Sequence, residues 1–153
     1  MKYLLILFIV ALAIAPLTHF LPSKRQRQQA KMREYAAVHG LFVEFRDLPA
    51  IPAQLPTRRK SRAEQAIYYG KRLKPSRAEP RPRRAWLRED GGWRGVERRW
   101  LVPDVVQAVP TAVEALSIDE GSCGVYWHEA GEEGDVALIV AALERWEQSL
   151  ISP

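Results

Sequence analysis

The feature that most constrains this chain is an uncharged apolar stretch near its start, residues 3–21. About 20 residues in an α-helix extend about 30 Å, which is the thickness of the hydrocarbon core of a bilayer. Two polar side chains, Thr18 and His19, lie toward the second end of the stretch, where headgroups and water can solvate them. The stretch therefore predicts a single transmembrane anchor over residues 1–22.

Two other interpretations of this stretch compete with the anchor. A cleaved signal peptide is compatible with Lys2 and with the small-x-small pattern of residues 13–15. Pro16 would follow that cut, where proline is a poor fit for the peptidase, and the dense positive charge that comes next resists translocation. A buried core helix is disfavoured because the stretch has no polar stripe. We therefore expect an anchor that is not cleaved.

Positive charge gives the anchor a direction. Before it stand only Lys2 and the terminal amine. The segment 23–40 begins with these basic residues: Lys24, Arg25, Arg27, Lys31 and Arg33. Basic residues gather on the cytoplasmic side of a membrane span, so these five are the predicted topology and membrane-surface residues. The N-terminus is then expected outside a bacterial inner (plasma) membrane and the bulk of the chain in the cytoplasm.

Charge is divided unevenly along the chain. Residues 1–99 contain 22 Lys or Arg and 8 Asp or Glu, whereas residues 100–153 contain 1 and 10. Either the two halves fold together and partly neutralise each other, or the basic half faces anionic headgroups. The carboxylates of residues 129–135, Glu129 among them, are expected to form a solvated acidic surface. The single cysteine, Cys123, excludes an intramolecular disulfide and agrees with a reducing compartment.

The fold class predicted for the part after the anchor is α+β. A basic juxtamembrane helix is expected over residues 23–40, since Ser23 suits a helix start and Gly40 a helix end. The domain over residues 41–153 is expected to hold a small, mostly antiparallel sheet of about four or five strands covered by short helices and a C-terminal amphipathic helix. Alternation, residue type and turn chemistry predict strands over residues 41–46, 66–73, 85–89, 93–100 and 123–128.

The remaining elements follow from local signals. Asp90-Gly91-Gly92 predicts a hairpin turn, across which Trp86 and Trp93 are expected to pair. An apolar stripe at 3.6-residue spacing predicts the last helix, over residues 136–150.

Proline placement adds two further expectations. Pro103 and Pro110 each suit a first helical position, so two short helices are expected over residues 103–117. Residues 74–84 contain three prolines and five basic residues and are expected to form a flexible basic loop.

Groups able to carry out catalysis are sparse. The three histidines (His19, His39 and His128) are scattered, and Glu132 stands where a zinc-protease motif has its second histidine. Cys123 and His128 are five residues apart, so on one strand they point to opposite faces, and a buried structural cysteine is expected. The chain has neither a phosphate-cradling glycine loop nor a dinucleotide fingerprint. We therefore expect no catalytic residue, no metal site and no cofactor.

The layout of the first 46 residues resembles the start of YajC-type accessory subunits of the bacterial preprotein translocase. The likeness lies in the apolar anchor, in the neck Leu21-Pro22-Ser23-Lys24-Arg25-Gln26-Arg27, and in the LFVEF strand that follows the basic helix. The resemblance implies a single-pass membrane protein with a small cytoplasmic domain and a place at the translocase. It assigns no functional residue, because a proline-rich loop replaces the glycine-rich pattern that this family has after its first strand. The rest of the chain looks like small single-pass proteins of proteobacterial inner membranes.

These features predict a non-enzymatic bitopic inner-membrane protein whose cytoplasmic domain binds a membrane-protein partner, with the preprotein translocase as a candidate. The alternative is a peripheral binder of anionic lipid or nucleic acid that uses residues 58–99, where 15 Lys or Arg face 5 Asp or Glu. For the basic run of residues 23–39, a nucleic-acid role is weak, since basic residues directly after an anchor usually set topology. An enzyme built on Cys123 or His128 is the least favoured interpretation.

Overall fold

The computed structural model describes residues 2–14, 22–49, 66–75 and 81–151. The helices in these ranges are α1 (Lys2–Ile14), α2 (Lys24–Val38), the short 3₁₀ helix η3 (Asp104–Gln107) and α3 (Glu133–Ile151). The strands are β1 (Leu41–Arg46), β2 (Ala66–Arg72), β3 (Arg84–Glu89), β4 (Gly92–Gly95), β5 (Val113–Ile118) and β6 (Ser122–Trp127). The predicted α+β class is confirmed, with six strands in place of the expected four or five.

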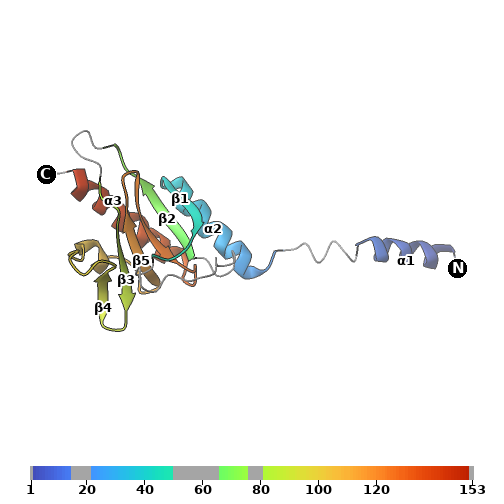
Figure 1. The fold of residues 1–153 in the computed structure, drawn as a ribbon. Helices are drawn as coiled ribbons and strands as arrows, with labels where there is room; N and C mark the ends of the chain where they lie inside the picture. Colours follow the sequence, from blue (N-terminus) through green and yellow to red (C-terminus); the bar gives the residue numbers. More distant parts are fainter. Residues whose placement is uncertain (1, 15–21, 50–65, 76–80, 152–153) are drawn as a thin grey trace.

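The sheet is antiparallel throughout, in the order β1-β2-β6-β5-β3-β4 (Figure 1). Strands next to each other in sequence form three hairpins, and β6 lies between β2 and β5 near the middle of the sheet. The helices α2 and α3 contact each other and lie on one face of this sheet (Figure 1). The domain is therefore a two-layer arrangement of helices on a sheet.

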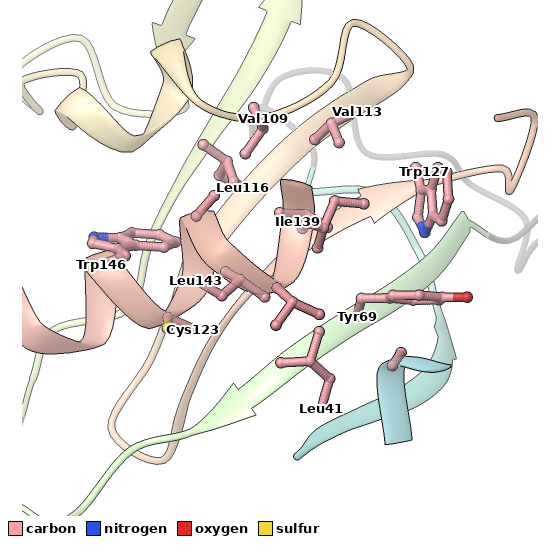
Figure 2. Packing of buried hydrophobic residues seen from close by; sticks show 14 of the residues in the cluster. Leu41, Tyr69, Val109, Val113, Leu116, Cys123, Trp127, Ile139, Leu143 and Trp146 are labelled. Atoms are coloured by element: carbon pink, nitrogen blue, oxygen red, sulfur yellow. The ribbon is translucent and has the colours of Figure 1, made fainter. Parts of the chain in front are cut away.

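The buried side of α3 fills the space between the helices and the sheet, as its apolar stripe predicts. The buried members of the stripe are Val136, Ile139, Val140, Leu143 and Trp146. Figure 2 shows Ile139 and Leu143 of α3 among the buried side chains of the core cluster, to which the strands of the sheet also contribute. Cys123 lies in the same cluster with none of its surface exposed, so the prediction of a buried cysteine is confirmed.

The prediction of two short helices over residues 103–117 is wrong for its second half. Pro103 precedes η3, but Val113–Ile118 is the strand β5, which pairs with both β3 and β6. A register shift between Val113 and Ala115 breaks the alternation of β5. The apolar residues Val113 and Leu116 are consequently three apart, a spacing that imitates a helix.

The predicted pairing of Trp86 with Trp93 is also wrong. The register of the hairpin places Trp86 opposite Gly95 and Trp93 opposite Arg88. The Arg88 guanidinium lies 4.8 Å from the centroid of the Trp93 ring, so a cation–π contact takes the place of the expected aromatic pair.

The second face of the sheet is lined by aromatic side chains that lie over glycines. The Tyr68 ring covers Gly70 and Gly124, and a Cβ atom at either glycine would collide with it. Phe42 packs beside Tyr68, with 5.7 Å between ring centroids, and the Arg46 guanidinium lies 4.0 Å from the centroid of the Tyr68 ring. The two glycines therefore let a large ring lie flat on the strands.

The predicted anchor coincides with α1 in its first part. Every described side chain from Tyr3 to Ala11 is exposed. Within the described residues, no helix combines the length and the apolar character needed to cross a membrane. The second part of the predicted anchor, residues 15–21, and residues 76–80 of the predicted basic loop lie outside the described residues.

Candidate functional site

The helix α2 begins at a capping box, and this fixes where its basic residues lie. The Ser23 hydroxyl accepts a hydrogen bond from the backbone N–H of Gln26 at 3.2 Å, and the Gln26 side chain accepts one from the backbone N–H of Ser23 at 2.8 Å. These two bonds satisfy amide groups that a helix start otherwise leaves unpaired. The helix starts at Lys24, so the first basic residues stand in its first turn.

Four of the five predicted membrane-surface residues project into solvent. This α2 cation cluster consists of Lys24, Arg25, Arg27 and Lys31, all exposed. The first turn of α2 contains no acidic residue that would offset their charge. The helix dipole adds a further partial positive charge at the same end, so the cluster favours an anionic surface next to it.

The fifth predicted residue, Arg33, is turned toward the domain. Its Nε donates to Oε1 of Glu129 at 2.7 Å, and its second guanidinium nitrogen donates to Oε2 at 2.6 Å. The hydroxyl of Tyr69 donates to the same Oε1 at 2.8 Å. A bidentate ion pair and one further hydrogen bond thus join α2, β2 and the residues after β6.

The prediction that Glu129 belongs to a solvated acidic surface is wrong. Only 3% of Glu129 is exposed, and its side chain is fully buried at the ion pair, whereas 36% of the Arg33 side chain is exposed. Its backbone has a φ of 50°, which is unusual for a residue other than glycine. A buried carboxylate needs a cation and hydrogen-bond donors, and Arg33 and Tyr69 supply both.

The network also affects the titration of its members. Hydrogen bonding to Glu129 raises the pKa of the Arg33 guanidinium. Burial, followed by the hydrogen bond to Glu129, raises the pKa of the Tyr69 hydroxyl. Arg33 therefore stays charged and Tyr69 stays protonated over the whole physiological pH range.

A depression of about 350 Å³ lies between the first half of α2 and the segment after β6. Arg25, Gln28 and Met32 line it from the helix, and Glu129 and Gly131 line it from the opposite side. The Gln28 side chain donates to the carbonyl oxygen of Gly131 at 3.3 Å. This hydrogen bond holds the first half of α2 against the segment after β6. The helix therefore contacts the domain through its first half as well as through its last turns.

Cys123 and His128 do not form a catalytic pair. Burial raises the pKa of the Cys123 thiol to about 12, so thiolate formation is strongly disfavoured at neutral pH. His128 follows β6 on the exposed side, and its Nε2 lies 3.5 Å from a carboxylate oxygen of Glu114. In the part of the chain that the structure describes, no group of three or more His, Cys, Asp or Glu side chains is arranged to hold a metal ion.

The described part of the basic segment 58–99 is not one continuous surface. Arg83 and Arg84 are neighbours at the start of β3 and line different hollows. Arg83 lines a polar cavity of about 330 Å³ with Tyr126 and Asp119, whereas Arg84 lines an apolar groove of about 260 Å³ with Trp86.

Comparisons with known proteins add no relative. No family model, curated protein or solved structure matches this chain. The resemblance to the YajC-type subunits therefore stays a prediction.

Two residues of the site, Tyr69 and Glu129, had no recognisable signal in the sequence. Glu129 is 96 positions from Arg33 and 60 from Tyr69, so only the fold brings the three together. Glu129 also stands at the edge of an acidic run, so nothing in the sequence distinguishes it from the carboxylates of that run that face solvent.

Proposed function

We propose that this chain is a non-enzymatic bitopic inner-membrane protein whose cytoplasmic domain binds a membrane-protein partner. In this proposal, residues 3–21 embed in the bilayer with the N-terminus outside. The α2 cation cluster lies at the cytoplasmic headgroups, and the α+β domain presents a binding surface to the partner. The YajC-like layout of the first 46 residues makes the preprotein translocase the candidate partner.

The observation that carries the proposal is the exposed apolar surface of α1. Leu4, Leu5, Ile6, Leu7, Phe8, Ile9 and Val10 are each at least half exposed. Covering seven such side chains is worth roughly 10–20 kcal/mol, at about 1.5–3 kcal/mol each. A bilayer offers that cover to a helix that is apolar on every side.

The attachment of α2 to the domain supports a fixed placement at the membrane. The contact of Gln28 with Gly131 and the ion pair of Arg33 with Glu129 hold α2 along the domain. A helix joined in this way keeps the domain close to the bilayer, because the connection from the anchor to Lys24 is short. The exposed cations then gain about 1 kcal/mol each from an anionic leaflet.

Binding is favoured over catalysis by the state of the single cysteine, Cys123. A buried cysteine with a raised pKa is a poor attacking group, and His128 is not positioned to activate it. The hollows described above are lined by arginine and aromatic side chains, which are residue types that recur at protein interfaces.

Topology is tested by fusing alkaline phosphatase or a fluorescent protein to the C-terminus of the full chain. We expect the fluorescent fusion to be active and the phosphatase fusion to be inactive, because the first requires the cytoplasm and the second the exported side. Partner binding is tested by crosslinking in intact membranes followed by mass spectrometry.

A matched control separates topology from overall charge. Replacing Lys24, Arg25 and Arg27 with glutamine should allow a fraction of chains to invert, whereas replacing Arg94, Arg98 and Arg99 with glutamine should leave the orientation unchanged. An exported C-terminus in the unaltered chain would contradict the proposal, and so would crosslinking that recovers no membrane protein above background.

A further inference from the structure

A groove of about 260 Å³ lies between the start of β3 and the second half of α3. We name it the β3–α3 groove after the elements that flank it. Its lining residues are Arg81, Pro82, Arg84, Trp86, Ile118, Trp146 and Leu150. It is one of the two hollows whose lining supports the proposed binding function, and that proposal assigns it no ligand.

Among the described residues, the lining of this groove carries positive charge and contains no carboxylate. Both charged residues in the lining are arginines. Arg81 donates to the carbonyl oxygen of Lys74 at 3.0 Å, a neutral acceptor. In the described part of the chain, Arg84 is exposed and has no ion pair. A carboxylate brought to the groove would therefore meet two guanidinium groups that make no ion pair with a carboxylate of the described residues.

The floor of the groove is apolar and held firmly in place. Trp86 and Trp146 meet edge to face, with 5.9 Å between their ring centroids. The Trp86 indole N–H donates to the carbonyl oxygen of Leu101 at 3.0 Å, which fixes the orientation of that ring. Figure 2 shows Trp146 at the edge of the core, on the part of α3 that extends beyond Leu143. Only 3% of Trp86 and 5% of Trp146 is exposed, so the two rings form a rigid buried base beneath the groove. The apolar lining that is open to a ligand beside the two arginines consists of Pro82 and Leu150.

The groove lies at the end of the domain opposite to the α2 cation cluster. α2 starts beside Gly131 and, over its 15 residues, runs about 22 Å to the start of β1. At that far end Leu41 pairs with Lys71, and Lys74, which contacts Arg81, follows shortly afterwards. The groove and the cation cluster are therefore separated by about the length of α2, so a bilayer held at the cluster need not cover the groove, and a protein segment is the favoured occupant.

We infer that the β3–α3 groove binds an acidic, apolar peptide segment of a partner protein, with one or two carboxylates on Arg81 and Arg84 and an apolar side chain against Pro82 and Leu150. This rests on the proposed function in one respect, since that proposal makes the partner a protein. The volume of the groove suits one large side chain and its neighbours, which is less than a drug-sized ligand needs.

The test uses the full chain in detergent micelles and a panel of fluorescein-labelled pentapeptides. In each peptide, Leu, Phe or Trp is flanked by Asp or Glu, and a matched peptide carries Asn or Gln instead. Fluorescence anisotropy gives the affinity. We expect saturable binding of acidic members of the panel, at least fivefold tighter than their neutral counterparts and weaker at higher salt.

Two double variants separate the groove from overall charge. The pair Arg81→Gln and Arg84→Gln should weaken binding about fivefold to tenfold, as two partly exposed ion pairs imply. The pair Arg98→Gln and Arg99→Gln changes the net charge equally outside the groove, and its effect should stay below twofold.

Several results would overturn the inference. These are no saturable binding by any acidic peptide, equal weakening in both double variants, or displacement of the peptide by anionic phosphatidylglycerol vesicles. Self-association of the chain that is lost in the variant with Arg81→Gln and Arg84→Gln would make a second copy the occupant. Retention of the same variants in membranes is measured separately, so a failure of peptide binding is distinguishable from a failure of the proposed membrane attachment.

Discussion

Glu129 has a fully buried side chain and three short contacts to Arg33 and Tyr69. A charge in this position is tolerated only because a cation and hydroxyl donor compensate it, so removing the cation leaves a buried carboxylate that is poorly solvated. At the scale of single residues, this contact decides how firmly α2 is attached to the sheet.

We expect Arg33→Gln to lower the free energy of unfolding by about 2–4 kcal/mol. The estimate lies below the full cost of breaking a completely buried pair, because the Arg33 side chain is partly exposed. Thermal unfolding of the full chain in detergent, followed by tryptophan fluorescence, measures the effect. Lys31→Gln removes the same charge from an exposed position on the same helix and should cost less than about 0.5 kcal/mol. Equal effects of the two substitutions would mean that the ion pair does not stabilise the fold.

Alkaline pH tests the buried hydroxyl and thiol groups. Burial raises the pKa of Tyr68 from 10.0 to about 12 and the pKa of Cys123 from 9.0 to about 12. Above pH 9–10 the unfolded chain releases protons that the folded chain keeps. Stability is therefore complete below about pH 9 and falls as the pH rises toward 12, with a slope of up to about 1.4 kcal/mol per pH unit for each group. Melting temperatures between pH 8 and pH 11.5 should show this fall, with a shallower slope in Tyr68→Phe. A stability that rises over this range would contradict the assignment.

At the scale of elements, the second face of the sheet depends on two glycines beneath one ring. A Cβ at Gly70 would collide with the rings of Tyr68 and Phe42, and a Cβ at Gly124 would collide with Tyr68 and the carbonyl oxygen of Tyr69. Side chains packed this closely leave no room for a methyl group without a shift of the strands.

Gly70→Ala should therefore destabilise the domain by about 1–3 kcal/mol. Gly121→Ala, in the turn between β5 and β6, is the control, since the nearest atom to its Cβ would be an Asp119 oxygen at 3.9 Å. Its cost should remain within about 0.5 kcal/mol. Melting temperatures of both variants provide the comparison, and a Gly70→Ala protein as stable as the control would refute the packing described for Tyr68.

Elements with strong local signals could be predicted from the sequence. The capping residues of α2, the alternation of β1 and the apolar stripe of α3 placed these elements to within a few residues. β5 could not be predicted, because its register shift removes the period-two pattern and leaves an apolar spacing typical of a helix. Its identity as a strand comes from pairing with β3 and β6, which no local window contains.

At the scale of the whole molecule, the candidate site combines parts that only the fold brings together. The basic run after the first apolar stretch indicated the α2 cation cluster, but Arg33 belongs to an ion pair with a residue 96 positions away. The β3–α3 groove likewise joins residues 81–86 with the last helix, and it lies at the opposite end of the domain from the cation cluster. The arrangement gives the domain two basic regions with different roles in our proposals: one for lipid headgroups and one for a protein partner.

The central claim is that residues 3–21 hold this chain in a membrane. Its most direct test is the intact mass of the protein recovered after membranes are washed with alkaline carbonate. We predict that the uncleaved chain stays in the membrane pellet with residues 3–21 present. A soluble chain that lacks its first 15 residues would contradict the account, because the domain would then belong to an exported protein.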